Sequence, residues 1–292
     1  MDAERQLSAA ATAARAALAG CEKSPGATKS DPILVADSVR RTFGGITAVD
    51  VDHLEVQRGS ITALIGPNGA GKTTLFNLLT GFDSVDQGTW SFDGRAMNKV
   101  APHRMASLGM VRTFQLTKSL TKMSVIENMR LGATGQKGEK WWNGLVSSTW
   151  KKQEGEITER AEVLLERFKL NHMRDEYAGA LSGGQRKLLE MARALMTNPR
   201  LVMLDEPMAG VNPALKQSLN EHIRGLRDEG MTVLFVEHDM EMVHDISDWV
   251  IVMAEGRVIA EGTPDDISSN PAVIDAYLGS HQGRSLMEDE HE

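Results

Sequence analysis

The sequence predicts an α/β fold in which a mainly parallel core sheet carries a phosphate-binding loop and is interrupted by a helical insertion. A short apolar run, Ile61–Ile65, leads into a glycine-rich turn and then a helical pattern. A second apolar run, Leu201–Leu204, ends at two adjacent carboxylates, and a third, Thr232–Val236, ends near a histidine. From Leu116 to Ala180 the apolar spacing becomes helical. Open parallel sheets bind ligands at the carboxyl ends of their strands, so all three run ends are candidate site positions.

The composition limits the class of protein. The chain has 292 residues, 41% of them hydrophobic and 25% charged, enough for one large domain or a domain with a subdomain. A net charge of −8 disfavours a nonspecific nucleic-acid binder, so we expect no nucleic-acid partner. The single cysteine, Cys21, excludes intramolecular disulfides and thiolate metal clusters. The apolar runs are much shorter than the roughly 20 residues of a membrane span, so any membrane association is expected through partners.

The firmest prediction is a phosphate loop with the spacing G-x-x-x-x-G-K-T between Gly66 and Thr73. Glycines let backbone N–H groups approach a polyphosphate closely, and the start of the following helix adds a favourable dipole. Lys72 is placed to contact the β- and γ-phosphates, and the Thr73 hydroxyl to bind Mg²⁺. A flexible turn with a solvated lysine is the alternative, but the preceding strand and following helix argue against it. The loop comprises Gly66, Pro67, Asn68, Gly69, Ala70, Gly71, Lys72, Thr73 and Thr74.

Two carboxylates follow the apolar run at 201–204. Asp205 suits an outer-shell Mg²⁺ role, and Glu206 could orient and deprotonate a water in line with the γ-phosphate. The alternative is a strand-end cap without a chemical role. A buried strand rarely ends in paired acids, which favours the functional interpretation.

A second anion site is predicted at Ser182, Gly183, Gly184 and Gln185, the LSGGQ segment, because these residues precede or begin a helical run. One chain rarely needs two such sites, unless the second faces a phosphate bound to another subunit. An ordinary capped helix is the alternative.

Two further residues are candidates by position. His238 follows the apolar strand 232–236, where its ring could reach the γ-phosphate; a structural histidine is the alternative. Phe43 lies beside the Gly44–Gly45 turn upstream of the phosphate loop and could stack on an adenine. A packed strand-end aromatic is equally consistent with the pattern.

The remaining segments define the expected domains. The alanine-rich start, with Arg15 interrupting it, is not a secretory signal and is expected to be a transient helix or disordered tail.

Lys137–Lys152 contains Trp141, Trp142 and Trp150 with basic flanks. This segment predicts either a membrane or membrane-protein interface or a helix packing its tryptophans on the subdomain. The expected parts are a tail at 1–30, a nucleotide-binding domain at 31–262 with a helical subdomain at about 116–180, a helical extension at 263–280 and an acidic tail at 281–292.

Taken in order, GPNGAGKTT, Gln115, LSGGQ, LVMLDEP and His238 resemble the ATP-binding subunit of ABC transporters over about Asp31–Leu278. The resemblance implies a P-loop NTPase cassette with a RecA-like core sheet, an N-terminal antiparallel β subdomain and an inserted helical subdomain. It implies that Lys72 and Thr73 hold phosphate and Mg²⁺, and that Gln115 senses the metal and couples to the transmembrane partner. Asp205 then supports Mg²⁺, Glu206 is the base and His238 the γ-phosphate switch. Ser182, Gly183 and Gly184 act on the ATP of the facing subunit, and Phe43 matches the adenine-stacking aromatic.

Finer features are similar to the branched-chain (hydrophobic) amino-acid importers: the VRTFQ segment, the tryptophan-rich insertion and the closing NPAVIDAYLG. Residues 209–212, AGVN, replace the more usual SALD after the carboxylates, which affects cross-dimer contacts. The resemblance implies a partner cassette, identical or related, two permease subunits, and indirectly an extracytoplasmic solute-binding protein. It places the chain at the cytoplasmic face of the inner membrane.

Other functions remain open at this point. Within transport, a urea or amide importer and a lipopolysaccharide-type or lipid exporter have similar ATPases. From another class, a soluble ABC ATPase of translation or DNA repair is possible, but those usually carry two cassettes, zinc modules or long coiled coils, none of which is evident here.

Overall fold

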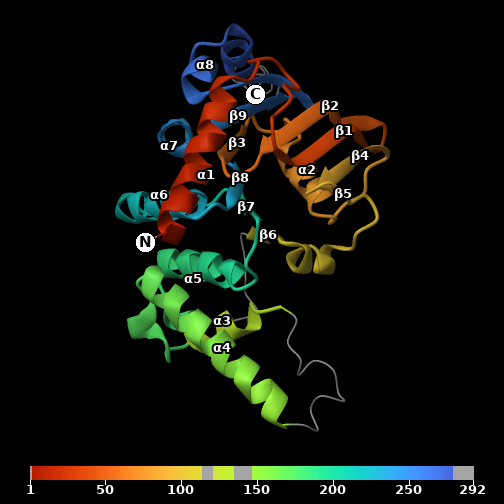
Figure 1. Cartoon of the computed structure of the whole chain (residues 1–292). Coiled ribbons are helices and arrows are strands. Elements are labelled where there is room, and N and C mark those ends of the chain that lie inside the picture. The colour runs from red at the N-terminus through yellow and green to blue at the C-terminus, as the bar shows by residue number, and fades with distance from the viewer. Residues whose placement is uncertain (1, 114–120, 135–146, 279–292) are drawn as a thin grey trace, which may run out of the picture. The chain divides into compact units, whose positions relative to one another are not determined.

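The computed structural model describes residues 2–113, 121–134 and 147–278, apart from the side chains of 2–8, 147–151 and 214. The chain divides into two compact units (Figure 1). The first unit comprises Met1–Pro102, Leu204–Glu206 and Ile223–Glu292, and the second comprises His103–Met203 and Pro207–His222. Gln115 and Trp141–Trp142 lie outside the described residues, as does the side chain of Trp150.

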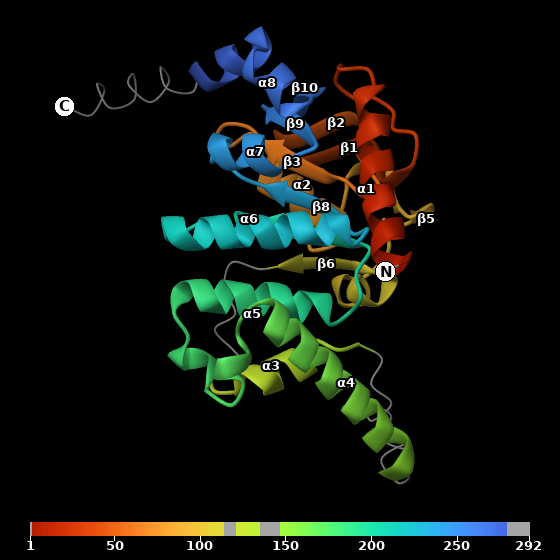
Figure 2. The same ribbon diagram turned by 60° about the vertical axis from the view of Figure 1, so that its left-hand side comes forward.

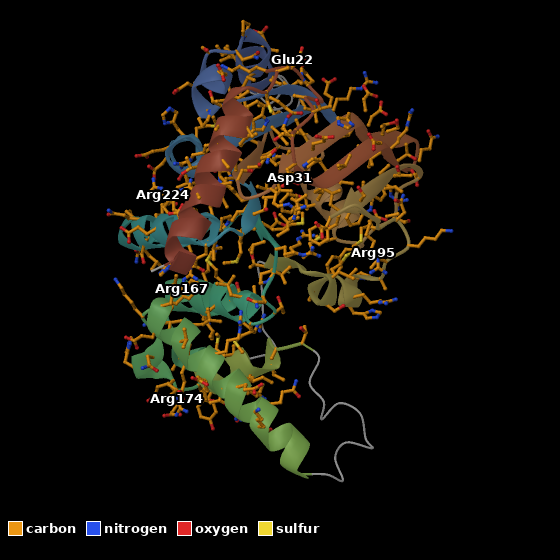
Figure 3. The ribbon with its side chains drawn as sticks, viewed as in Figure 1. Glu22, Asp31, Arg95, Arg167, Arg174 and Arg224 are labelled. Atoms are coloured by element: carbon orange, nitrogen blue, oxygen red, sulfur yellow. The ribbon has the colours of Figure 1, made fainter. Side chains whose placement is uncertain are left out.

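An antiparallel sheet with strand order β2-β1-β4-β5 occupies one part of the first unit. Its strands are β1 (Pro32–Phe43), β2 (Ile46–Gln57), β4 (Gln87–Phe92) and β5 (Arg95–Ala96). β1 and β2 form a hairpin around Gly44 and Gly45, whose φ angles of 56° and 90° favour glycine. Arg58 forms ion pairs with Asp31, labelled in Figure 3, and with Asp93, which join the beginning of β1 to the turn after β4.

The core of the first unit is a second sheet whose strands follow the order β10-β9-β3-β8. These strands are β3 (Ile61–Ile65), β8 (Thr232–Val236), β9 (Trp249–Ala254) and β10 (Arg257–Gly262). β3 runs parallel to β8 and β9, and all residues of β3 and β8 are buried, which explains their uninterrupted apolar sequences. The last residues of β7 (Leu201–Asp205) belong to this unit too. β9 and β10 form a hairpin that turns at Glu255–Gly256.

Helices α2 (Lys72–Leu79), α7 (Met240–Ile246) and α8 (Pro264–Ser268) belong to the first unit. α8 lies beside β9 and β10 (Figure 2). It begins with a capping box in which Thr263 and Asp266 satisfy each other's backbone N–H groups. A further helix spans residues 271–278.

Of the two states expected for the N-terminal segment, a transient helix or a disordered tail, the structure has the helix. Residues Asp2–Ala19 form helix α1 (Figure 1). The side chains of Ala11, Ala14 and Leu18 on this helix are buried. Arg15 on α1 pairs at 2.6 Å with Asp248, a buried carboxylate that also accepts the backbone N–H of Ile61 at the start of β3. An alanine-rich helix has a small apolar face, so its burial depends on these distant contacts rather than on a strong periodic pattern.

We expect Leu18→Ala to lower the free energy of unfolding by about 2–4 kcal/mol, because the side chain is 2% exposed and alanine leaves a cavity. Alanine is the better helix former, so the loss would report packing of α1 rather than helix propensity. Urea unfolding of the full chain measures the change, with the exposed Ala16→Ser as the matched control. Equal stability of Leu18→Ala and wild type would show that α1 is detached in solution.

The second unit is largely helical. Its described helices include α3 (Val125–Leu131), α4 (Ser147–Arg167) and α5 (Gly183–Leu195), with the beginning of α6 (Pro213–Asp228). The predicted helical insertion is therefore present, but the unit also includes α5, the strand β6 (Met110–Thr113) and the first residues of β7. Two short 3₁₀ turns, Pro102–Arg104 and Ala106–Leu108, precede β6. Among the described residues, no helix is both long and apolar enough to cross a membrane.

Candidate active site

The phosphate loop closely follows β3 and needs glycine at defined positions. A Cβ at Gly66 would lie 2.0 Å from the carbonyl oxygen of Met253, and one at Gly71 would lie 2.3 Å from that of Ala48. Gly71 also has a φ of 96°, in the region that favours glycine. The loop is therefore packed directly on the backbone of β9 and β2, and its shape is fixed before any ligand binds.

Lys72 is the first residue of α2, and its ammonium lies inside the loop. Its Nζ donates to the carbonyl oxygens of Gly66 at 2.6 Å and Pro67 at 2.9 Å. Burial lowers the pKa of Lys72, while the negative charge of Glu206 opposes that shift. Glu206 is thus close enough for its charge to act on the loop lysine, as the sequence interpretation requires.

The two carboxylates come from the end of β7. Glu206 has a left-handed backbone with φ of 46°, and its N–H donates to the carbonyl oxygen of Val236 at the end of β8. Such a conformation is costly for a non-glycine residue and is concentrated at functional sites. Asp205 and Glu206 are both half-buried, so neither is a core residue nor a freely solvated one.

His238 follows β8 by two residues, and its side chain is 67% exposed. Its backbone N–H donates to the carboxylate of Glu237, which is 1% exposed, and its Nδ1 lies 3.8 Å from the same carboxylate. Since β3, β8 and the end of β7 finish at one edge of the sheet, the phosphate loop, Glu206 and His238 share that edge. The structure therefore brings together three of the features predicted separately.

Phe43 ends β1 and is 48% exposed, so it is not a core aromatic. The guanidinium of Arg41 lies over its ring at 4.6 Å, and Arg41 is itself held by ion pairs with Asp83 and Asp86. Because a cation holds one face of the ring, the opposite face is well oriented for stacking on a base.

The LSGGQ segment belongs to the second unit and has an open backbone. Ser182 and Gln185 form a capping box at the start of α5. Gly183 is exposed, and a Cβ there would meet nothing within 4 Å; at Gly184 a Cβ would lie 1.8 Å from Leu215. The segment thus presents exposed N–H groups at a helix N-terminus, as predicted for a second anion site.

The donor set present fits Mg²⁺. Among the described residues, no group of three or more His, Cys, Asp or Glu side chains could hold a metal ion. Mg²⁺ is usually bound by one or two protein oxygens together with phosphate oxygens and water, rather than by an all-protein cage. The exposed Thr73 and the half-buried Asp205 can supply such oxygens. Gln115, the other predicted ligand, lies outside the described residues.

Two features of the structure were not foreseen from the sequence. Lys187 on α5 donates through Nζ to the carbonyl oxygen of Pro207, directly after Glu206, at 2.9 Å. The hydroxyl of Tyr277, in the closing helix, is buried, and burial raises the pKa of this phenol. The closing NPAVIDAYLG was the signal available for Tyr277, but it carried only a family resemblance and no contact.

The fold and the loop, carboxylate and LSGGQ features define an ATP-binding cassette. Comparison with known proteins agrees: the family model "ABC transporter" matches residues 49–209, and the model "Branched-chain amino acid ATP-binding cassette transporter" matches residues 257–282. A probable branched-chain amino acid transport ATP-binding protein LivG from Archaeoglobus fulgidus is 44% identical, covering 85% of this chain and 96% of the relative. BraF of Pseudomonas aeruginosa, a high-affinity branched-chain amino acid transport ATP-binding protein, is 41% identical, covering 86% of this chain and 99% of the relative. A solved structure, the ADP conformation of an ATP-binding cassette of an ABC transporter, is 39% identical in sequence. The match has a TM-score of 0.75 and covers 86% of this chain and 100% of that chain.

The chain belongs to the ATP-binding proteins of ABC transporters, in the branched-chain amino-acid transporter family. Its predicted fold, its nature as an ATPase coupled to transport, and its binding of ATP are confirmed. Membership implies permease partners, because the ATP-binding protein is one subunit of such a transporter.

Proposed function

We propose that this chain is one of two cassettes that drive an importer of branched-chain, hydrophobic amino acids at the cytoplasmic face of the inner membrane. The second cassette is an identical or related chain, and both lie beneath two permease subunits that receive solute from an extracytoplasmic binding protein. The observation that carries the proposal is that the match to the branched-chain relatives extends over 85% of the chain, including its C-terminal part. The chain itself handles no amino acid, since the solute-binding residues belong to its partners.

In this proposal the loop residues hold the nucleotide and its metal. The backbone N–H groups of the phosphate loop surround the phosphates, and Lys72 exchanges its carbonyl partners for phosphate oxygens. Thr73 and Asp205 hold Mg²⁺, with Gln115 as the metal sensor. An ion held there would supply positive charge to offset the charge that develops on the phosphate oxygens.

Glu206 and His238 act on the water and the γ-phosphate. Glu206 accepts a proton from the attacking water, from its position at the end of β7. His238 senses the γ-phosphate from the end of β8. Phe43 stacks on the adenine, and Ser182, Gly183, Gly184 and Gln185 complete the pocket of the facing subunit.

The domain assignment is part of the same proposal. Residues 31–262 form the cassette and 263–280 a helical extension, preceded by the N-terminal segment and followed by an acidic end at 281–292. The helical subdomain occupies about 116–180 within the larger second unit.

Purification of the intact complex, followed by reconstitution in liposomes, tests the solute. We expect ATP-dependent uptake of radiolabelled leucine, isoleucine and valine in the presence of the binding protein, and none in vesicles containing Glu206→Gln. Selective uptake of urea or an amide, or copurification with a lipopolysaccharide-type exporter, would replace the proposed solute while leaving the ATPase assignment intact.

A further inference from the structure

The connection between α2 and β4, residues 80–86, is tied to the end of β1. The backbone N–H of Asp86 donates to the carbonyl oxygen of Arg40 at 2.9 Å. The carboxylate of Asp86 accepts both the backbone N–H and the hydroxyl of Thr42, each at 2.7 Å. The backbone that leads directly into Phe43 is therefore held by the segment that follows the helix of the phosphate loop.

The guanidinium of Arg41 lies between two carboxylates of the same connection. Its Nε and Nη2 contact Asp83 at 3.1 and 2.8 Å, and its Nη1 contacts Asp86 at 2.7 Å. None of the three side chains is more than 34% exposed, so they form a network rather than an isolated surface pair. A cation flanked by two anions is a poor ligand for a phosphate. Arg41 is better placed to act on a nucleotide through the ring of Phe43, which its guanidinium covers at 4.6 Å.

A β-bulge beside this network joins the same hairpin to the phosphate loop. The register of β1 and β2 shifts between Arg41 and Thr42, which makes Ala48 the extra residue of β2. The carbonyl oxygen of Ala48 would lie 2.3 Å from a Cβ at Gly71, so this hairpin packs on the phosphate loop. The hairpin backbone thus sets where Phe43 stands relative to the phosphate loop, and the tilt of its ring depends on side-chain contacts such as that with Arg41.

We infer that Arg41 is a positioning residue for the base of the nucleotide: held by Asp83 and Asp86, it covers one face of the Phe43 ring and fixes the tilt at which the other face receives the adenine. The inference rests on the proposed stacking of Phe43 on adenine and adds what orients that ring. An exposed ring without such a contact populates several rotamers, and ordering it on binding costs affinity. Loss of the guanidinium should therefore weaken binding of the base and leave the phosphate contacts and the chemical step unchanged.

The first test compares Arg41→Met with wild type, since methionine keeps an unbranched stem and removes the guanidinium. We expect the Kd and KM for MgATP to rise about three- to tenfold while kcat stays within about twofold, because the base is held equally in the ground and transition states. Magnesium tripolyphosphate, which has the phosphates but no base, should bind with the wild-type Kd. Calorimetry on the full chain measures both ligands.

Arg40→Met is the matched control, because Arg40 is the neighbouring residue and its side chain faces Asp50 instead, at 4.0 Å. This control should match wild type in Kd, KM and kcat. Asp86→Asn tests the network from its other side: it weakens the hold on Arg41 but keeps an oxygen for the backbone N–H of Thr42. It should raise the Kd for MgATP in the same direction by a smaller factor, and it serves if Arg41→Met folds poorly.

A double-variant cycle shows whether Arg41 acts through the ring. Phe43→Leu alone should raise the Kd for MgATP about tenfold or more, because the stacking partner of the base is lost. Adding Arg41→Met to Phe43→Leu should change the Kd no further, since the ring that Arg41 orients is absent.

The outcomes separate this inference from the proposed function. A wild-type Kd in Phe43→Leu would overturn the adenine stacking and the inference with it. Weaker binding in Phe43→Leu together with a wild-type Kd in Arg41→Met would overturn the inference alone. Weaker binding of tripolyphosphate by Arg41→Met, or an additive loss in the double variant, would show that Arg41 acts on the phosphate loop or on general stability and would also contradict it.

Discussion

Glu206→Gln lowers the turnover of ATP by at least about a hundredfold and leaves nucleotide binding largely intact, because general-base catalysis contributes about 10²–10⁴ in rate. The phosphate loop, Lys72 and Thr73 are unchanged in this variant. Glutamine has the same shape as glutamate and keeps the left-handed backbone at position 206. The backbone N–H of this residue can therefore still donate to the carbonyl oxygen of Val236. With binding preserved and water activation removed, the variant should accumulate as an ATP-bound closed dimer.

Steady-state ATPase assays, fluorescent-nucleotide binding and size-exclusion chromatography with MgATP measure these three properties. Glu221→Gln is the matched control, since Glu221 is exposed on α6 and has no proposed chemical role. Turnover of Glu206→Gln at the wild-type rate would refute the assignment of the base.

Gly183→Asp should lower the rate of ATP hydrolysis at least about a hundredfold. The variant chain should still fold and bind ATP in its own phosphate loop. A Cβ at Gly183 meets nothing within 4 Å, so the new side chain fits without moving its neighbours. A carboxylate at the first turn of α5 is also favourable for the helix itself. The loss would therefore come from placing a negative charge against a γ-phosphate held by another subunit.

Gly155→Asp is the control for Gly183→Asp, because Gly155 also has open space around it and lies on α4 in the same unit. Circular dichroism and nucleotide binding should match wild type for both variants, and only Gly183→Asp should lose ATPase activity. Full activity of Gly183→Asp would exclude a role for the LSGGQ segment at a phosphate.

Much of the site could be predicted because its signals are local. The glycines that pack against Met253 and Ala48, the strand that delivers Asp205 and Glu206, and the capped start of α5 each show a pattern within a short stretch of sequence. Parallel strands then place their ends at one edge, so the assembly of loop, base and histidine follows from topology.

The contacts that the sequence did not predict join residues that are distant in the chain. Helix α1 is fixed by Arg15 and the buried Asp248, and its alanines give no strong apolar stripe. The same is true of Lys187 and Pro207, where the acceptor is a backbone carbonyl that has no signature in the sequence. Such pairings depend on tertiary structure alone.

The central claim is that each ATP pocket is completed by a second cassette. The most direct measurement is the ATPase rate per mole of purified chain over a dilution series, with sedimentation reporting the oligomeric state. The account predicts that the rate per mole falls towards zero as the chain becomes monomeric, or that the chain alone is inactive until its partner cassette is added. A monomer that hydrolyses ATP at the undiminished rate would contradict it.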